Sequence, residues 1–126
     1  MNAARGLLAI TVLLVAVLAN KTPQGAYCGS YSFGLVSGKV TFSEGTFDIT
    51  IDGLGTHLKC ASEAYTVDPS TGKLAVPGAA DPKNCLGGPL RDNGLSLAAT
   101  YHADADAVDL DLGISTVTVT KSCDTH

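Results

Sequence analysis

The chain has 126 residues and a formal net charge of −4, with four cysteines and no tryptophan. This length supports a single domain, and the composition is that of a globular chain rather than a disordered one. The acidic balance argues against nucleic acid and anionic membrane surfaces as partners.

Residues 1–19 have the pattern of a secretory signal peptide. Arg5 supplies an early positive charge, an apolar run extends from Leu7 to Ala19, and the small residues Val17 and Ala19 stand where a cleavage signal requires them. The run is shorter than the roughly 20 residues that span a bilayer, which makes a permanent anchor the less favoured interpretation. Cleavage after Ala19 leaves residues 20–126 as one β domain of a secreted, extracellular protein without a membrane span.

The new N-terminus would begin with Asn20-Lys21-Thr22, which matches the acceptor pattern for N-linked glycosylation. Asn20 is therefore the expected glycan site, and the chain is a candidate glycoprotein. A glycan there would mark an exposed surface and not a mechanism.

The region from Tyr27 to Val76 alternates apolar and polar residues between turn signals, which predicts β-strands. In the fourth of these strands, the alternation that starts from Leu58 places Cys60 and Ala64 inward and Glu63 on the polar face with His57. The expected strands cover residues 27–36, 39–43, 47–52, 56–67 and 74–76.

The pattern stops between Pro77 and Gly94, where glycines and prolines exclude a long regular element. A single helical turn is expected over residues 81–86, with Asp81 as its N-cap. Alternation then resumes in three strands near residues 95–101, 108–112 and 117–119. The chain is thus predicted to be all-β, with about eight antiparallel strands in an up-and-down meander that forms a closed or nearly closed barrel. A two-sheet β-sandwich is the alternative, because it has similar strand spacing.

Four cysteines behind a signal peptide predict two disulfides, since the secretory pathway is oxidising. Cys28 lies on the polar face of its strand and Cys60 on the inward face, so these two fit each other poorly. The first and last strands of a barrel are neighbours, which predicts Cys28–Cys123. Cys60–Cys85 then restrains the long connection.

Several inward positions of the predicted barrel carry small side chains, so the centre could be hollow. Such a cavity would suit a small hydrophobic, lipid-like ligand, and the leading hypothesis is a secreted, non-enzymatic binding protein. The alternative is an ordinary filled core. The architecture is similar to that of lipocalins, but their Gly-x-Trp start requires a tryptophan, and no family is assigned. The expected cavity residues are Gly29, Tyr31, Phe33, Phe42, Phe47, Ala64, Ala99 and Tyr101.

A second hypothesis uses the connection between Pro77 and Gly94 as a contact for another extracellular protein, as in a secreted protease inhibitor or a surface interaction domain. Lys83, Leu86, Leu90 and Arg91 would form the contact, and Cys85 would restrain it. The simpler interpretation is a crossover that caps one end of the barrel.

His102, Asp104 and Asp106 would point the same way on an extended strand, which raises the question of a cation site. A solvated hairpin is the preferred interpretation, because a turn is expected at residues 103–106. No nucleophile elbow, phosphate-binding loop or metalloprotease motif is present in the sequence. The sequence therefore predicts no catalytic residue, no metal and no cofactor.

Overall fold

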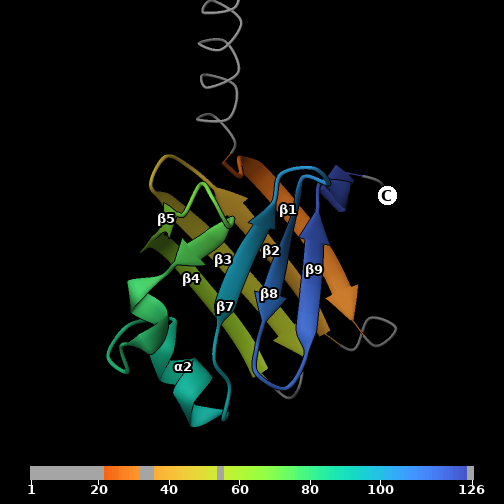
Figure 1. Cartoon of the computed structure of the whole chain (residues 1–126). Coiled ribbons are helices and arrows are strands. Elements are labelled where there is room, and N and C mark those ends of the chain that lie inside the picture. Colours follow the sequence, from red (N-terminus) through yellow and green to blue (C-terminus); the bar gives the residue numbers. More distant parts are fainter. Residues whose placement is uncertain (1–21, 32–35, 54–55, 125–126) are drawn as a thin grey trace, which may run out of the picture.

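A computed structural model describes residues 22–31, 36–53 and 56–124, which form nine strands, one α-helix and two short 3-10 helices (Figure 1). The signal peptide pattern at 1–19, the expected glycan site at Asn20, and Phe33 lie outside the described residues. In chain order the elements are β1 (Gly25–Tyr31), β2 (Val36–Phe42), β3 (Thr46–Gly53), β4 (Thr56–Ala64), β5 (Thr66–Val67), β6 (Lys73–Ala75), η1 (Pro77–Ala80), α2 (Gly87–Asp92), β7 (Ala98–His102), β8 (Ala107–Asp111), β9 (Thr116–Thr120) and η2 (Ser122–Asp124).

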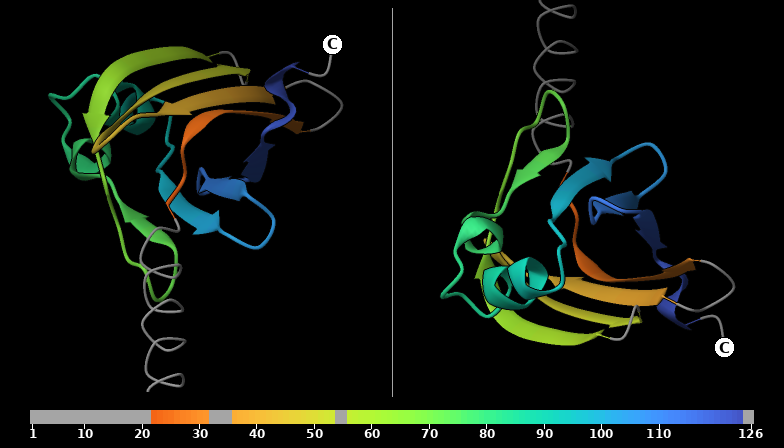
Figure 2. Two further views of the ribbon diagram at one scale, coloured as in Figure 1. Left: turned by 90° about the horizontal axis from the view of Figure 1, so that it is seen from above. Right: turned by 90° about the horizontal axis from the view of Figure 1, so that it is seen from below.

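All nine strands belong to one antiparallel sheet with the order β4-β3-β2-β1-β9-β8-β7-β6-β5. The two edge strands, β4 and β5, are consecutive in the chain and are separated only by Tyr65, so the chain itself joins the two edges of the sheet. Seen along its axis, the sheet curls around a common centre (Figure 2). The prediction of a nearly closed antiparallel barrel is confirmed, and β4 with β5 corresponds to the single long strand expected at 56–67.

Alternation in the sequence explains which side chains fill the barrel. On β2, Val36, Val40 and Phe42 are buried, while the intervening Ser37 and Lys39 are exposed. The register pairs Val40 with Ile49 and Phe42 with Phe47 of β3, so apolar side chains of neighbouring strands meet on the inner face. Burial of this face is the main stabilising contribution to the barrel.

One bulge in β4 reverses the expected alternation. Phe47 pairs with Glu63 and Ile49 with Cys60, and Ser62 adopts a left-handed backbone with φ of 57°. The Ser62 amide donates a hydrogen bond of 2.9 Å to Asp48 Oδ1, which holds the extra residue in place. Beyond this point Glu63 faces inward and is 5% exposed, whereas Ala64 is exposed. The predicted inward position of Ala64 and outward position of Glu63 are therefore wrong.

The connection between β6 and β7 covers the barrel where β5 and β6 are too short to extend the sheet. Figure 1 places α2 beside the ends of β4 and β7. Leu86 and Leu90 are 0% and 2% exposed and belong to the core. The helical turn expected over 81–86 is replaced by non-helical turns, and the α-helix lies further along the chain, at Gly87–Asp92. Asp81 still acts as a local cap, since its Oδ1 accepts a hydrogen bond of 2.9 Å from the Lys83 amide.

Both predicted disulfides are present. Cys28–Cys123 joins β1 to η2, which directly follows β9, and thereby reinforces the contact between the first and last strands. Cys60–Cys85 ties the connection between β6 and β7 to β4. In the described ranges no helix is long and apolar enough to cross a membrane.

Candidate functional site

The expected ligand cavity inside the barrel is largely filled by side chains. Phe42, Phe47, Ala99 and Tyr101 are buried, but the space that Phe42, Phe47 and Ala99 line with their neighbours is only about 10 Å³. That space is about one water-sized probe, far below the size of a ligand site. Tyr31 lies at the end of β1, and its side chain is outside the described part of the structure, as is Phe33.

Two of the small residues expected to leave space inside the barrel, Ala64 and Gly29, do not do so. Ala64 is exposed because of the bulge in β4. At Gly29 a Cβ would lie 2.1 Å from the Thr118 carbonyl oxygen, so glycine is needed there to let the β9 backbone approach β1. Gly29 therefore serves packing and does not line an open cavity.

The predicted contact loop also differs from the observed arrangement. Lys83 and Arg91 are exposed, but Leu86 and Leu90 are buried in the core and offer no surface to a partner. This connection covers one end of the barrel, as in the simpler of the two interpretations of the sequence.

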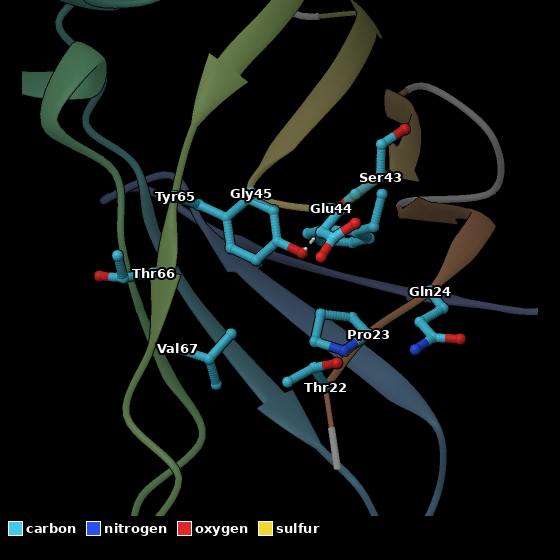
Figure 3. Close-up of a pocket in the computed structure, with 10 residues that line it drawn as sticks. Thr22, Pro23, Gln24, Ser43, Glu44, Gly45, Tyr65, Thr66 and Val67 are labelled. Atoms are coloured by element: carbon cyan, nitrogen blue, oxygen red, sulfur yellow. Dashed lines mark hydrogen bonds between the residues drawn. The ribbon is translucent and has the colours of Figure 1, made fainter. Parts of the chain in front are cut away.

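A hollow lies at the end of the barrel where β1 begins, β2 turns into β3 and β4 passes into β5 (Figure 3). This mouth cleft has a volume of about 660 Å³, which is within the range of small-molecule sites. Its residues come from three segments that are distant in the sequence: 22–24, 42–45 and 65–67. They are Thr22, Pro23, Gln24, Phe42, Ser43, Glu44, Gly45, Tyr65, Thr66 and Val67.

Backbone turns position these segments. Gly45 adopts φ of 79° in the β2–β3 turn, a left-handed backbone conformation that favours glycine. The Gly45 carbonyl accepts a hydrogen bond of 3.2 Å from the Tyr65 amide, which fixes the β4–β5 junction against this turn. Pro23 is fully buried, so the segment before β1 is held in the wall of the mouth cleft.

An aromatic cluster forms the inner wall of the mouth cleft. The Tyr65 ring packs edge-on against Phe42 and Phe47, with centroid distances of 5.3 and 5.9 Å. The Tyr65 hydroxyl donates a hydrogen bond of 3.0 Å to the Ser43 carbonyl, and burial raises the pKa of this phenol above its ordinary value. Tyr65 is thus a neutral, fixed aromatic surface that a ligand can contact.

The rim of the mouth cleft is polar. Thr22, Gln24 and Thr66 are exposed and offer hydroxyl and amide groups, while Glu44 is the one charged residue among those that line the cleft. Its carboxylate would repel an anionic ligand and attract a cationic one. The arrangement combines an apolar wall with a few hydrogen-bonding groups at the entrance.

A polar network lies on the other side of the segment 22–24. The Tyr27 and Tyr101 hydroxyls donate hydrogen bonds of 2.6 and 2.9 Å to Asp106 Oδ1, and the Lys121 Nζ lies 4.6 Å from the centre of the Tyr27 ring. Burial and the bond to Asp106 raise the pKa values of both phenols. Thr22 and Gln24 line both the mouth cleft and the smaller hollow of about 390 Å³ above this network.

Two of the three suspected cation ligands, His102 and Asp106, are engaged elsewhere. Asp106 binds the two tyrosines, and His102 Nε2 lies 2.9 Å from Asp109 Oδ2 on the neighbouring strand. Thr118 Oγ1 donates a hydrogen bond of 2.6 Å to the other oxygen of Asp109, and this bond, together with His102, lowers the Asp109 pKa. His57 pairs with Asp52 on the outer surface of β3 and β4.

No family model, curated protein or solved structure matches the chain. The mouth cleft was not identified from the sequence, although Phe42 was assigned to the ligand site. No signal in the sequence marks it, because its three segments are distant in the chain.

Proposed function

We propose that the protein is a secreted, non-enzymatic binding protein that holds a small hydrophobic ligand in the mouth cleft rather than in the barrel centre. The observation that carries this proposal is the difference between two volumes. The mouth cleft, with the Tyr65 and Phe42 rings in its wall, has about 660 Å³, whereas the space left between the side chains in the barrel centre has only about 10 Å³. Ligand sites are commonly found at the mouths of barrels. The signal peptide pattern and the two disulfides support an extracellular location.

The lining restricts the chemistry of the ligand. Phe42, Tyr65 and Val67 offer apolar and aromatic surface, which favours a molecule with a hydrocarbon or aromatic body. Glu44 is the only charge among the lining residues, so a neutral or cationic head group fits better than the carboxylate of a fatty acid. We therefore expect a neutral or cationic lipid-like molecule.

A fluorescence titration with the neutral probe N-phenyl-1-naphthylamine tests this proposal. The protein should bind the probe at a single site, and Val67→Asp should weaken binding at least about tenfold, which corresponds to about 1.4 kcal/mol, because a carboxylate is introduced into the apolar wall. Glu44→Gln should leave the affinity for this neutral probe unchanged and increase it for an anionic fatty-acid analogue.

Ile114→Asp is the matched control. Ile114 is 64% exposed between β8 and β9, and it is the one large hydrophobic side chain that is strongly exposed among the described residues. A probe that adheres to exposed apolar surface in general would respond to Ile114→Asp. If both variants bind like the wild type, or if only Ile114→Asp loses binding, the mouth cleft is not the binding site.

A further inference from the structure

The hollow of about 390 Å³ beside the mouth cleft, which we term the polar hollow, is lined by polar and charged groups. Thr22 and Gln24, which flank Pro23 in Figure 3, line both hollows, so the mouth cleft and the polar hollow adjoin along this segment. The polar hollow contains a carboxylate, on Asp106, and an ammonium group, on Lys121. A molecule that extends across the segment would contact an apolar wall at one end and two opposite charges at the other.

Two tyrosines hold the carboxylate of Asp106 in place. Tyr27 and Tyr101 are 0% and 9% exposed, and their hydroxyls donate hydrogen bonds of 2.6 and 2.9 Å to Asp106 Oδ1. Burial, together with the bond to Asp106, raises the pKa of both phenols, so both remain protonated donors at neutral pH. Both bonds end on Oδ1, and Asp106 is only partly buried where it lines the polar hollow. Its carboxylate is therefore fixed in position and accessible to a ligand.

The ammonium group of Lys121 is held by the first of these tyrosines. The Lys121 Nζ lies 4.6 Å from the centre of the Tyr27 ring and donates a hydrogen bond to the Gln24 carbonyl. Both ion pairs among the described residues use a histidine, so Lys121 and Asp106 do not neutralise each other in a direct ion pair there. Tyr27 contacts both groups, through its hydroxyl and its ring, and thereby brings a negative and a positive charge to the same hollow.

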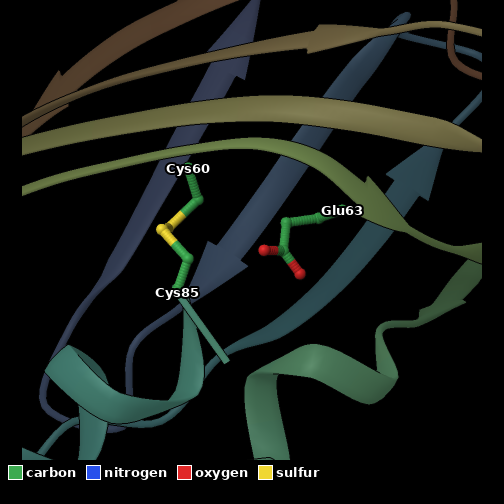
Figure 4. A group of neighbouring side chains, drawn as sticks. All are labelled: Cys60, Glu63 and Cys85. Carbon is green, nitrogen blue, oxygen red and sulfur yellow. A yellow bond between two sulfur atoms is a disulfide. The ribbon is translucent and has the colours of Figure 1, made fainter. Parts of the chain in front are cut away.

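The charges that can select a ligand are few. Among the described residues that line the two hollows, the charged ones are Glu44 in the mouth cleft and Asp106 and Lys121 in the polar hollow. Glu63 faces inward as well, but it lies beside the Cys60–Cys85 disulfide (Figure 4) and belongs to neither lining. The polar hollow therefore offers one charge of each sign.

We propose that the polar hollow binds the zwitterionic head group of the ligand whose apolar body lies in the mouth cleft, an inference that rests on the proposed function. The cationic group of the ligand contacts Asp106, and its phosphate or carboxylate contacts Lys121. The ligand is then a zwitterionic amphiphile, such as a lipid with a phosphocholine head group. A zwitterion has no net charge, so Glu44 does not exclude it, whereas a fatty acid would pair with Lys121 and leave Asp106 without a counter-charge.

Isothermal titration calorimetry of the full secreted protein with three amphiphiles of similar chain length tests this proposal. They are dodecylphosphocholine, dodecyltrimethylammonium and dodecanoate, each below the concentration at which it forms micelles. The wild type should bind dodecylphosphocholine at least about tenfold more tightly than either singly charged amphiphile, because only the zwitterion satisfies both charges. Free phosphocholine should bind at least about a hundredfold more weakly than dodecylphosphocholine, because it has no apolar body to bury.

Two substitutions should change the affinities in opposite directions. Asp106→Asn keeps an oxygen for the tyrosine hydroxyls and tolerates the left-handed backbone at φ of 48°, but it removes the negative charge. It should weaken binding of dodecyltrimethylammonium and dodecylphosphocholine about fivefold and strengthen binding of dodecanoate. Lys121→Gln should weaken binding of dodecanoate and dodecylphosphocholine and strengthen binding of dodecyltrimethylammonium. A variant that fails to fold would lose all three amphiphiles, so opposite signs report charge and not packing.

Asp104→Asn is the matched control for Asp106→Asn. Asp104 is exposed in the same turn between β7 and β8 and lines neither hollow, so its substitution should change each affinity by less than about twofold. Equal effects of Asp104→Asn and Asp106→Asn would overturn the role assigned to Asp106.

The wild type separates failure of this inference from failure of the proposed function. If N-phenyl-1-naphthylamine binds but the three amphiphiles bind equally well, the head-group assignment is wrong and the proposed function stands. The same holds if free phosphocholine binds as tightly as dodecylphosphocholine, since the polar hollow would then take a soluble zwitterion independently of the mouth cleft. If neither the probe nor any amphiphile binds, the proposed function is wrong and the head-group assignment fails with it.

Discussion

Substitution of Gly29 by alanine tests whether small inward residues serve packing or leave a cavity. Gly29 pairs directly with Gly38 across β1 and β2, and neither has a left-handed backbone, so alanine is conformationally permitted at both positions. At Gly29 the new Cβ would lie 2.1 Å from the Thr118 carbonyl oxygen, whereas at Gly38 the nearest atom is Leu110 Cδ1 at 3.8 Å. The two variants therefore differ in contact and not in backbone preference.

The expected cost follows from this contact. Relief of the overlap at Gly29 requires β9 to move by about 1 Å, and overpacking of this kind costs about 3 kcal/mol when the obstacle is backbone. For a domain of about 100 residues, this lowers Tm by roughly 10–20 °C. Gly38→Ala should stay within about 1 kcal/mol of the wild type. Urea unfolding followed by circular dichroism, with both disulfides intact, measures both variants. If Gly29→Ala is as stable as Gly38→Ala, Gly29 faces free space and the packing argument fails.

Three further predictions concern the core and the titrating groups. Leu90→Ala should lower the free energy of unfolding by about 2–5 kcal/mol, because Leu90 is a core residue, whereas Arg91→Ala should change it by less than about 0.5 kcal/mol. Thermal unfolding of both variants measures these changes, and equal effects of the two substitutions would contradict the prediction. The pKa of Tyr27 is raised above its ordinary value of 10.0, so the contribution of this phenol to stability is complete below pH 10 and decreases above it as the unfolded chain ionises. The urea concentration at the midpoint of unfolding should therefore fall as the pH rises, and it should fall less in Tyr27→Phe. The pKa of Asp109 is held below 3.8 mainly by the hydrogen bond from the Thr118 hydroxyl, so the contribution of this carboxylate to stability is present above pH 3.8 and is lost as the pH falls through the folded-state pKa. Thr118→Val should raise the Asp109 pKa in a carboxyl NMR titration, and an unchanged pKa would refute this cause.

The strands and disulfides followed from the sequence because they depend on local alternation and on the order of neighbours in a barrel. The apolar residues of β2 and β3 have a period of two, and any arrangement that buries them requires strands. Cys28 and Cys123 belong to the first and last segments of a meander, which must be adjacent when the sheet closes. These inferences need no knowledge of side-chain packing.

The positions of Ala64 and Glu63 could not be derived in the same way. The residues Ala61-Ser62-Glu63 contain neither glycine nor proline to mark a bulge, and the left-handed Ser62 is stabilised by Asp48, which lies on another strand. A bulge of one residue reverses the inward and outward faces of everything that follows it. The inward position of Glu63 and the outward position of Ala64 therefore depend on a tertiary contact.

The mouth cleft was also beyond sequence reasoning. Its three segments become neighbours only when the barrel closes, and most of its residues lie in or near turns, where alternation carries no information. α2 is a similar case, because Gly87, Gly88 and Pro89 are poor indicators of a helix, and burial of Leu86 and Leu90 against the barrel stabilises it.

Methyl NMR during titration with N-phenyl-1-naphthylamine distinguishes a ligand at the mouth of the barrel from a ligand in its centre. A ligand in the mouth cleft should cause saturable shifts at Val67 and Thr22, which line this cleft, with little change at Val40 and Leu110, which line the space of about 10 Å³. Shifts concentrated at Val40 and Leu110, or no saturable shift at either set, would contradict binding in the mouth cleft.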